Sequence, residues 1–221
     1  MHFTVITTLH ENLTNGKGNN AKTNSYQNKQ SNSIIKEVKI GNQIWMAENL
    51  NVDKFRNGDP IPEAKSYEEW NRAGENKQPA WCYYDNDPSN GKKYGKLYNW
   101  YAVNDPRGLA PNGWHIPNDE EWTKLTEYLG GEMEAGNKMK NTSGWHKYNG
   151  TNESGFLGLP GGGRSNIGEF YNVGGSGDWW SSTETYLSTA WYRNLGYGFG
   201  GLSRNGYTYK DYGLSVRCLR D

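Results

Sequence analysis

The side chains that could do chemistry are few and lie far apart in this sequence. Its four histidines stand at positions 2, 10, 115 and 146, without the His-Glu-x-x-His spacing of a zinc site. The glycines of "GLPGGGRS" lack the lysine and following hydroxyl of a phosphate-binding loop, which favours a tight turn. His115 comes just before an expected helix and is interpreted as a structural hydrogen-bonding residue. We therefore expect no enzyme activity and no catalytic or metal-ligating residues.

The segment "DNDPSNG" is the one stretch with the oxygen ligands that calcium prefers. Asp85, Asp87 and Asn90 could supply them, but the spacing and the terminal glutamate of an EF-hand are absent. The same letters also make a good turn. Calcium stays open as a cofactor, and no other cofactor is expected.

The two cysteines, Cys82 and Cys218, are the only thiols in the chain. A disulfide between them would tie the end of the chain to its first half and shrink the unfolded ensemble. Two buried thiols are an equally consistent interpretation. The residues alone leave both alternatives open.

The segment from about residue 186 to residue 212 is crowded with Tyr, Gly, Ser and Asn. Antibody binding sites use this composition, because tyrosine offers a large amphipathic contact area with few rotatable bonds and small polar residues adapt to the partner. The competing interpretation is a glycine-rich tyrosine hairpin that only covers the core. The candidate ligand-binding residues are Tyr186, Tyr192, Tyr197, Phe199, Ser203, Asn205, Tyr207, Tyr209 and Asp211.

Composition limits the classes of partner. The 221 residues include 24 basic and 24 acidic side chains, so the sequence predicts no electrostatic capture of nucleic acid or of an anionic membrane. No apolar run approaches the ~20 residues that span a bilayer. Hydrophobic residues make up only 33%, but 10 Trp and 16 Tyr predict an aromatic core, and 29 Gly predict many turns.

Hydrophobic periodicity predicts an α+β domain over residues 35–221, preceded by a flexible polar segment over residues 1–34. We expect a β-hairpin from Ile34 with its turn at Gly41 and Asn42, and two aromatic strands around a loop at residues 85–93. A short helix is expected at residues 67–72, a second helix capped by Asn118, and a weaker third at 133–140. Short strands follow in "GDWWSSTE", "AWYRNLG" and "YGLSVRCLRD".

Six motifs occur in an order that resembles the Fibrobacter succinogenes major paralogous domain family. They are "IGNQIWMAENLN", "AWCYYDNDPSNGKKYGKLYNWYAV", "GWHIPNDEEWTKL", "NESGFLGLPGG", "WWSSTE" and "YGLSVRCLRD". The resemblance covers about residues 35–221 and implies a C-type-lectin-like fold, in which the terminal strands pair and a loop-rich half presents a ligand surface. Its members are typically bacterial and are often exported or anchored to the surface.

The resemblance also bears on the cysteines. Cys82 and Cys218 match family positions, which implies that they lie close together and points to an oxidising compartment. Ala110 stands where members often have a cysteine, so one potential thiol partner is missing. The beginning of the chain, "MHFTVITTLH", is a poor secretory signal.

Some proteins similar to this family are targets of diversity-generating retroelements, which randomise adenines in a C-terminal variable region. Randomising the first two bases of an AAC codon never yields Trp, Lys, Glu, Gln or Met. The residues that fit the permitted set are Tyr192, Gly196, Tyr197, Gly198, Phe199, Ser203, Asn205, Tyr207, Tyr209 and Asp211. Interleaved scaffold positions would be Trp191, Arg193, Leu195, Arg204 and Lys210.

The resemblance thus implies a diversified binding protein that recognises a protein or glycan on another cell. We expect the protein at the cell surface, outside the cell or on a phage particle. The sequence leaves open whether it forms oligomers. The alternative is a fixed-specificity carbohydrate-binding module of the cell envelope. Oxidases that generate formylglycine share the fold class and use a cysteine pair, but no acid, base or metal pattern accompanies the cysteines here.

Overall fold

The computed structural model describes residues 24–27 and 34–221. Its strands are β1 (Asn24–Gln27), β2 (Ile34–Ile40), β3 (Gln43–Met46), β4 (Trp81–Cys82), β5 (Leu97–Tyr98), β6 (Trp114–His115), β7 (Gly163–Arg164), β8 (Phe170–Tyr171), β9 (Ser176–Tyr186), β10 (Thr189–Gly196), β11 (Ser203–Tyr209) and β12 (Leu219–Arg220). Its helices are α1 (Tyr67–Glu75), the 3₁₀ turn η1 (Tyr84–Asn86), α2 (Pro88–Tyr94), α3 (Trp100–Val103), α4 (Asp119–Tyr128) and α5 (Glu132–Met139). The chain is therefore an α+β protein, as the sequence predicts. Within the described residues, no helix is both long and apolar enough to cross a membrane.

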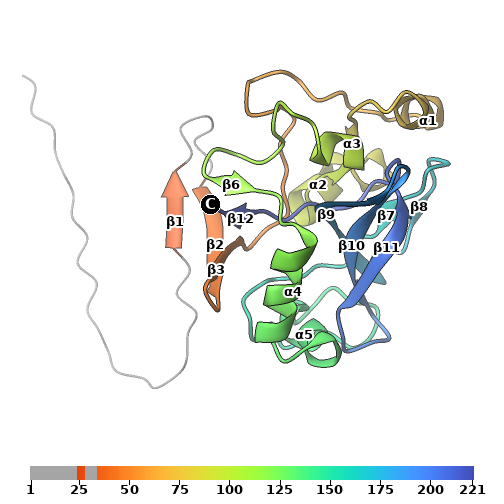
Figure 1. Ribbon diagram of the computed structural model, residues 1–221. Coiled ribbons are helices and arrows are strands. Elements are labelled where there is room, and N and C mark those ends of the chain that lie inside the picture. Colours follow the sequence, from red (N-terminus) through yellow and green to blue (C-terminus); the bar gives the residue numbers. More distant parts are fainter. Residues whose placement is uncertain (1–23, 28–33) are drawn as a thin grey trace, which may run out of the picture.

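An antiparallel sheet in the order β1-β2-β3-β12-β6 joins the two ends of the domain (Figure 1). β2 and β3 form the expected hairpin around Gly41, whose φ of 63° suits a residue without Cβ. Leu219 of β12 pairs with Trp45 of β3 and with His115 of β6, so the terminal strands pair as the resemblance implies. β1 falls in the segment expected to be flexible, yet it pairs with β2; the remainder of that segment lies outside the described residues.

A second sheet, in the order β11-β10-β9, carries the Tyr- and Gly-rich part of the chain. Tyr192 of β10 lies between Trp180 of β9 and Asn205 of β11, and the register shifts between Ala190 and Tyr192 on both sides. Figure 1 shows α4 between this sheet and the five-stranded one. The sequence predicts β9 and β10. Strand β11 lies within the Tyr- and Gly-rich segment of residues 186–212, for which a hairpin that only covers the core is the competing interpretation.

Two of the helices begin at capping boxes. Asn118 accepts from the backbone N–H of Glu121, and the Glu121 carboxylate accepts from Asn118 in return, as predicted. Ser66 and Glu69 do the same for α1, which runs to Glu75, beyond the predicted end. The expected loop at residues 85–93 instead holds η1 and α2, because Asp87 caps a helix with proline in its first turn.

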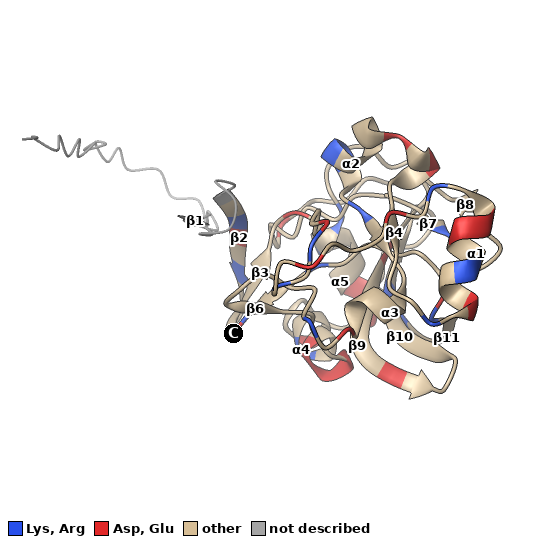
Figure 2. Ribbon diagram, turned by 90° about the horizontal axis from the view of Figure 1, so that it is seen from above, with Lys and Arg blue, Asp and Glu red and all other residues tan. Residues whose placement is uncertain are grey.

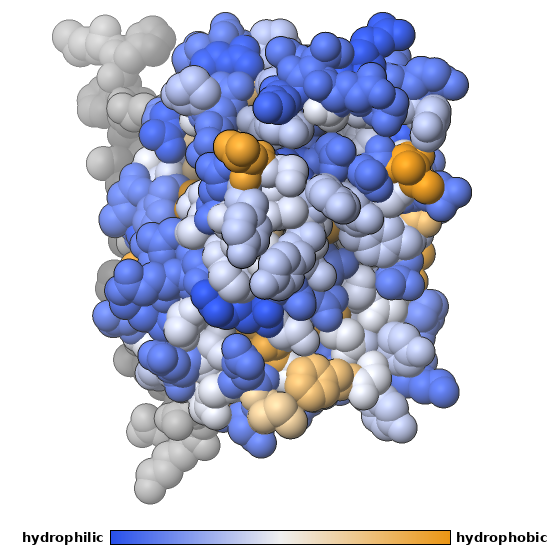
Figure 3. Space-filling view, turned by 45° about the vertical axis from the view of Figure 1, so that its right-hand side comes forward, coloured by the Kyte–Doolittle hydropathy of each residue, from blue (hydrophilic) through white to orange (hydrophobic). Residues whose placement is uncertain are grey.

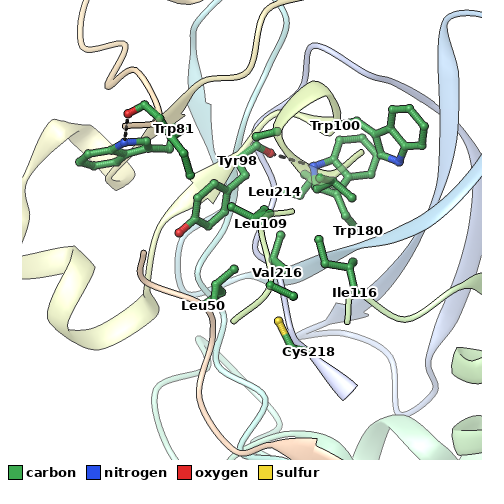
Figure 4. Close-up of a cluster of buried hydrophobic side chains, with 14 of the residues drawn as sticks. Leu50, Trp81, Tyr98, Trp100, Leu109, Ile116, Trp180, Leu214, Val216 and Cys218 are labelled. Atoms are coloured by element: carbon green, nitrogen blue, oxygen red, sulfur yellow. Dashed lines mark hydrogen bonds between the residues drawn. The ribbon is translucent and has the colours of Figure 1, made fainter. Parts of the chain in front are cut away.

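Large aromatic side chains fill the core, as the composition predicts. Trp45, Trp122 and Trp179 are fully buried and meet Phe156 in one cluster, where the Phe156 and Trp179 centroids lie 5.6 Å apart. Trp180 belongs to a second cluster, where its indole N–H donates to the Tyr98 carbonyl at 2.8 Å (Figure 4). Their burial compensates for the scarcity of aliphatic residues.

Buried cations hold the loops together. Arg164 is 1% exposed and donates to the carbonyls of Ala64, Lys65, Ser66 and Gly168. A backbone carbonyl buried without a donor costs as much as a lost hydrogen bond, so one guanidinium satisfies several at once. This role is not visible in the sequence, because the acceptors lie up to about a hundred residues away.

Candidate functional site

The candidate ligand-binding residues separate by exposure. Five of them are open to solvent, namely Tyr207 at 78%, Tyr186 at 63%, Tyr209 at 52%, Tyr197 at 44% and Phe199 at 40%. The others are half-buried, namely Tyr192, Ser203, Asn205 and Asp211. Both groups belong to the β9-β10-β11 sheet or to the segments next to it, but they do not form one continuous surface.

One exposed group, which we call the hairpin patch, consists of Tyr186, Leu187, Tyr207 and Tyr209. Tyr186 and Tyr209 lie on either side of Thr189 in the sheet register. The Tyr186 and Tyr207 rings are stacked, with centroids 6.3 Å apart and planes at 21°. Leu187 at the hairpin turn is 91% exposed. Figure 3 looks onto this side of the molecule, where pale side chains of intermediate hydropathy gather within a blue hydrophilic surface.

The second group, the loop patch, consists of Tyr197, Phe199 and the exposed Met133. It lies at the other end of β10, roughly 20 Å from the hairpin patch at about 3.3 Å per strand residue. Lys140, almost fully buried, donates its Nζ hydrogens to the carbonyls of Gly196 and Phe199. The loop between β10 and β11 is therefore tied to the chain segment that follows α5.

A tyrosine cluster extends inward from the hairpin patch. The ring of Tyr209 lies 6.4 Å from that of Tyr212, which lies 6.3 Å from that of Tyr171. Tyr192 packs against Trp180, with centroids 6.4 Å apart. Burial raises the pKa values of Tyr171 and Tyr192, so both keep their phenolic protons at neutral pH.

Sequence reasoning did not select Tyr171, Tyr212 or Leu187 for this surface. Tyr212 lies at the edge of the Tyr-rich segment and Leu187 lies within it. Their positions in the sequence would therefore have been enough to select them as candidates. Tyr171 lies in "EFYNVGG", remote from that segment, and no local signal connects it with the tail. The contact between Tyr171 and Tyr212 is a product of the fold.

Asp178 of β9 is a buried carboxylate near the tyrosine cluster. It is 3% exposed and accepts from Asn194 Nδ2 at 2.6 Å and from Ser176 Oγ at 2.8 Å. Burial raises the pKa of Asp178 to about 6, while these two hydrogen bonds oppose the rise. The carboxylate fixes β9 to β10 directly beside the register position of Tyr192.

The opposite face of the sheet is joined to α4. Arg193, 1% exposed, donates to Asp119 Oδ1 at 2.8 Å and to Thr123 Oγ1 at 3.2 Å. Arg204 donates to the second oxygen of Asp119 at 2.6 Å and lies 3.8 Å from the centroid of the Trp191 ring. Arg193 and Arg204, two of the expected scaffold positions, thus link β10 and β11 to α4.

Two candidate residues have structural contacts that sequence reasoning did not anticipate. Tyr192 packs on the main hydrophobic core as well as on Trp180. Asp211 lies against Gly74 of α1, its backbone carbonyl accepts from the Trp70 indole, and its Oδ1 is buried without a hydrogen-bond partner among the described residues. Both side chains contribute to packing beneath the surface.

The two cysteines are separate free thiols in the structure rather than a disulfide. Cys82 belongs to the cluster around Trp70, whereas Cys218 belongs to the main core cluster at the lower edge of Figure 4. Burial raises the pKa values of both thiols to about 12, so neither is a thiolate at neutral pH.

Two of the three residues considered for calcium have other partners. Asp87 caps α2 by accepting from the backbone N–H and hydroxyl of Ser89, and Asn90 donates to the Tyr84 carbonyl. The part of the chain that the structure describes contains no group of three or more His, Cys, Asp or Glu side chains arranged to hold a metal. His115 lies between Asp221 at 2.8 Å and Glu121 at 3.0 Å.

Comparison with protein families gives a match over residues 38–220 to the Fibrobacter succinogenes major domain. No curated protein and no solved structure matches the chain.

Proposed function

The chain belongs to the Fibrobacter succinogenes major domain family, and we propose that it is a ligand-binding protein whose recognition surface is the hairpin patch. The tyrosine cluster supports that surface from beneath. The ligand is a protein or a glycan on another cell, met by shape and aromatic contact. Figure 2 supports a neutral mode of recognition, because charges of both signs are scattered over the molecule without a single-sign face.

One observation carries the proposal: three exposed tyrosines stand at one end of a sheet that is held against α4 by ion pairs. Tyr186, Tyr207 and Tyr209 are each more than half exposed, whereas Arg193 of the same sheet is buried and paired with Asp119. A rigid platform lowers the entropy lost when a partner binds. Each tyrosine can remove up to about 150–250 Å² from water, which is the kind of anchor that dominates binding energy.

We further propose that the fold is C-type-lectin-like and that the exposed positions are diversified by a retroelement. The pairing of β12 with β3 supports the fold assignment. The exposed Tyr209 adjoins the buried Lys210, and this supports diversification, because an exposed side chain can change without changing the buried residues that hold the sheet. Substitutions among natural isolates are expected at the exposed positions, with the buried ones unchanged.

A fixed-specificity carbohydrate-binding module is the second candidate. The stacked pair Tyr186 and Tyr207 favours it, since two nearly parallel exposed rings offer flat faces to sugar rings. Sequencing the gene from several isolates separates the two candidates. Uniform tyrosines at 186, 207 and 209 favour the fixed module, whereas clustered replacements there favour diversification.

Binding itself can be tested with whole bacterial cells as the probe and the labelled full chain measured by flow cytometry. The double variant Tyr207→Ser/Tyr209→Ser is expected to lose at least tenfold in apparent affinity. Tyr148→Ser is the matched control, because Tyr148 is also exposed, at 74%, but lies elsewhere. Equal binding by the double variant, or equal loss in the control, would contradict the hairpin patch as the site. Treating the cells with periodate or with protease separates glycan from protein ligands.

We propose that the protein acts by binding, without catalysis, at the cell surface, outside the cell or on a phage particle. The two thiols support this proposal. Cys82 and Cys218 are buried and protonated, so they are poor nucleophiles and are protected from oxidants in an extracellular setting.

A further inference from the structure

A cavity of about 230 Å³ opens on a part of the molecule that contributes nothing to the hairpin patch. Its walls come from the segment after β3, the end of α2, and the segments around Asn141 and Leu159, with Arg217 among the lining residues. None of the lining residues belongs to β9, β10 or β11. The cavity is smaller than the roughly 300 Å³ at which pockets for drug-sized ligands begin, so it suits a small group.

The charges around this cavity favour an anion. The lining includes Lys92, Lys93 and Arg217, against a single carboxylate, Glu48. That carboxylate is already paired with Lys36 at 2.7 Å, on the exposed surface. Asn51 also lines the wall, and its amide donates to the Gly91 carbonyl.

Arg217 supplies the strongest argument, because its charge is buried and the carboxylate that attracts it, Glu48, lies beyond ion-pair distance. The side chain is 1% exposed, and its hydrogen bonds go to Asn49 Oδ1 and to the carbonyls of Met46 and Phe156, all neutral acceptors. No carboxylate of the described residues forms an ion pair with it. Burial lowers the pKa of Arg217 to about 9, which still leaves the guanidinium charged at neutral pH.

The hydrogen-bond geometry leaves a donor for a ligand. A guanidinium has five N–H groups. Nε donates once, Nη1 donates to two carbonyls, and Nη2 donates once to Asn49 at 2.7 Å. The second N–H of Nη2 has no acceptor among the described residues, and a buried charged donor gains most from an ionised acceptor.

We propose that this cavity binds a small oxyanion, a carboxylate, phosphate or sulfate group, with Arg217 at its wall and Lys92 and Lys93 beside it. Figure 2 shows the basic residues at one end of α2. The site is independent of the proposed recognition surface, so either can fail without the other.

The test uses the full chain titrated with sodium phosphate, sulfate, acetate or glucuronate, with sodium chloride keeping the ionic strength constant. The readouts are the thermal unfolding midpoint and the NMR signal of the Arg217 Nε–H, which burial shields from exchange. We expect a saturable shift of the Arg217 signal and a rise in the midpoint with at least one of these anions. Preference for phosphate identifies a phosphate group, and preference for glucuronate over acetate identifies an acidic sugar.

Arg217 also supports the fold, so the variants are made at the two lysines. Lys92→Gln/Lys93→Gln is expected to weaken the apparent affinity at least fivefold while leaving the unliganded midpoint unchanged. Lys39→Gln/Lys138→Gln is the matched control, because these lysines line a different cavity. The proposal is overturned if no anion gives a saturable shift, if chloride alone gives the same shift, or if both double variants lose equally.

Discussion

Asn49 is the residue on which four segments of chain converge. Its Oδ1 accepts from the Trp179 indole at 2.8 Å and from Arg217 at 2.7 Å, and its Nδ2 donates to the Tyr94 carbonyl and the Ser215 hydroxyl. Asn49 thus links the stretches "AENL", "WW" and "VRC", because its amide completes the hydrogen bonding of an indole and a guanidinium that are both buried.

Asn49→Ala is therefore expected to lower the free energy of unfolding by about 3 kcal/mol or more, because it leaves a buried indole N–H and charged donors of Arg217 without an acceptor. Urea unfolding at pH 7 measures the change. Asn57→Ala is the control, since its side chain is exposed and bonds only within its own turn. A loss at Asn49 no larger than at Asn57 would mean that water replaces the amide.

Asp178 predicts a dependence of stability on pH. Its pKa is raised from 3.8 to about 6 in the folded protein, so between these values the folded state holds a proton that the unfolded state has lost. Stability from this group is thus fully present below about pH 4 and is lost as the pH rises through about 6, a cost of about 3 kcal/mol at neutral pH. Asp178→Asn is expected to be more stable than the wild type at pH 7 by up to that amount and equal to it near pH 4. Unfolding of both proteins at each pH cancels the other titrations, and a difference that does not change with pH would refute the assignment.

At the scale of elements, helix α4 positions the β9-β10-β11 sheet through one carboxylate. Asp119 in its first turn, 15% exposed, meets Arg193 and Arg204 from two neighbouring strands. Asp119→Ala leaves the buried Arg193 unpaired and is expected to cost about 3–5 kcal/mol. Glu120→Ala is the matched control, because it removes a charge from the same turn and a surface pair with Lys124, worth less than about 1 kcal/mol. Thermal unfolding that ranks the two variants equally would show that the brace is dispensable.

Capping and turn residues in the sequence predicted the positions of two elements. The capping box at Asn118 located the start of α4, and the turn at Gly41 located the hairpin. The segment at residues 85–93, expected to be a loop, folds as η1 and α2. Proline after the Asp87 cap starts α2, and the polar residues of this helix give no hydrophobic periodicity that would indicate it. The braces of the site could not be predicted, since Arg193, Arg204 and Lys140 reach partners more than fifty residues away in the sequence.

The exposure of each tyrosine decides whether the folded protein can tolerate its substitution. Tyr186, Tyr207 and Tyr209 are more than half exposed, whereas Tyr192 packs on the core and on Trp180. Replacing all three exposed rings by serine is expected to change the free energy of unfolding by less than about 1 kcal/mol, since little buried area is lost. Tyr192→Ser removes a packed ring and is expected to cost about 3 kcal/mol.

Guanidinium unfolding of the triple variant Tyr186→Ser/Tyr207→Ser/Tyr209→Ser and of Tyr192→Ser measures this contrast, with wild-type m-values as the check that both unfold as one unit. The expected result means that the hairpin patch can vary without loss of the fold, whereas Tyr192 cannot. A large loss in the triple variant would instead show that the patch closes the core. That result would favour the interpretation that the hairpin only covers the core. It would count against the proposal that the hairpin recognises a partner, because a surface needed for stability is not free to diversify.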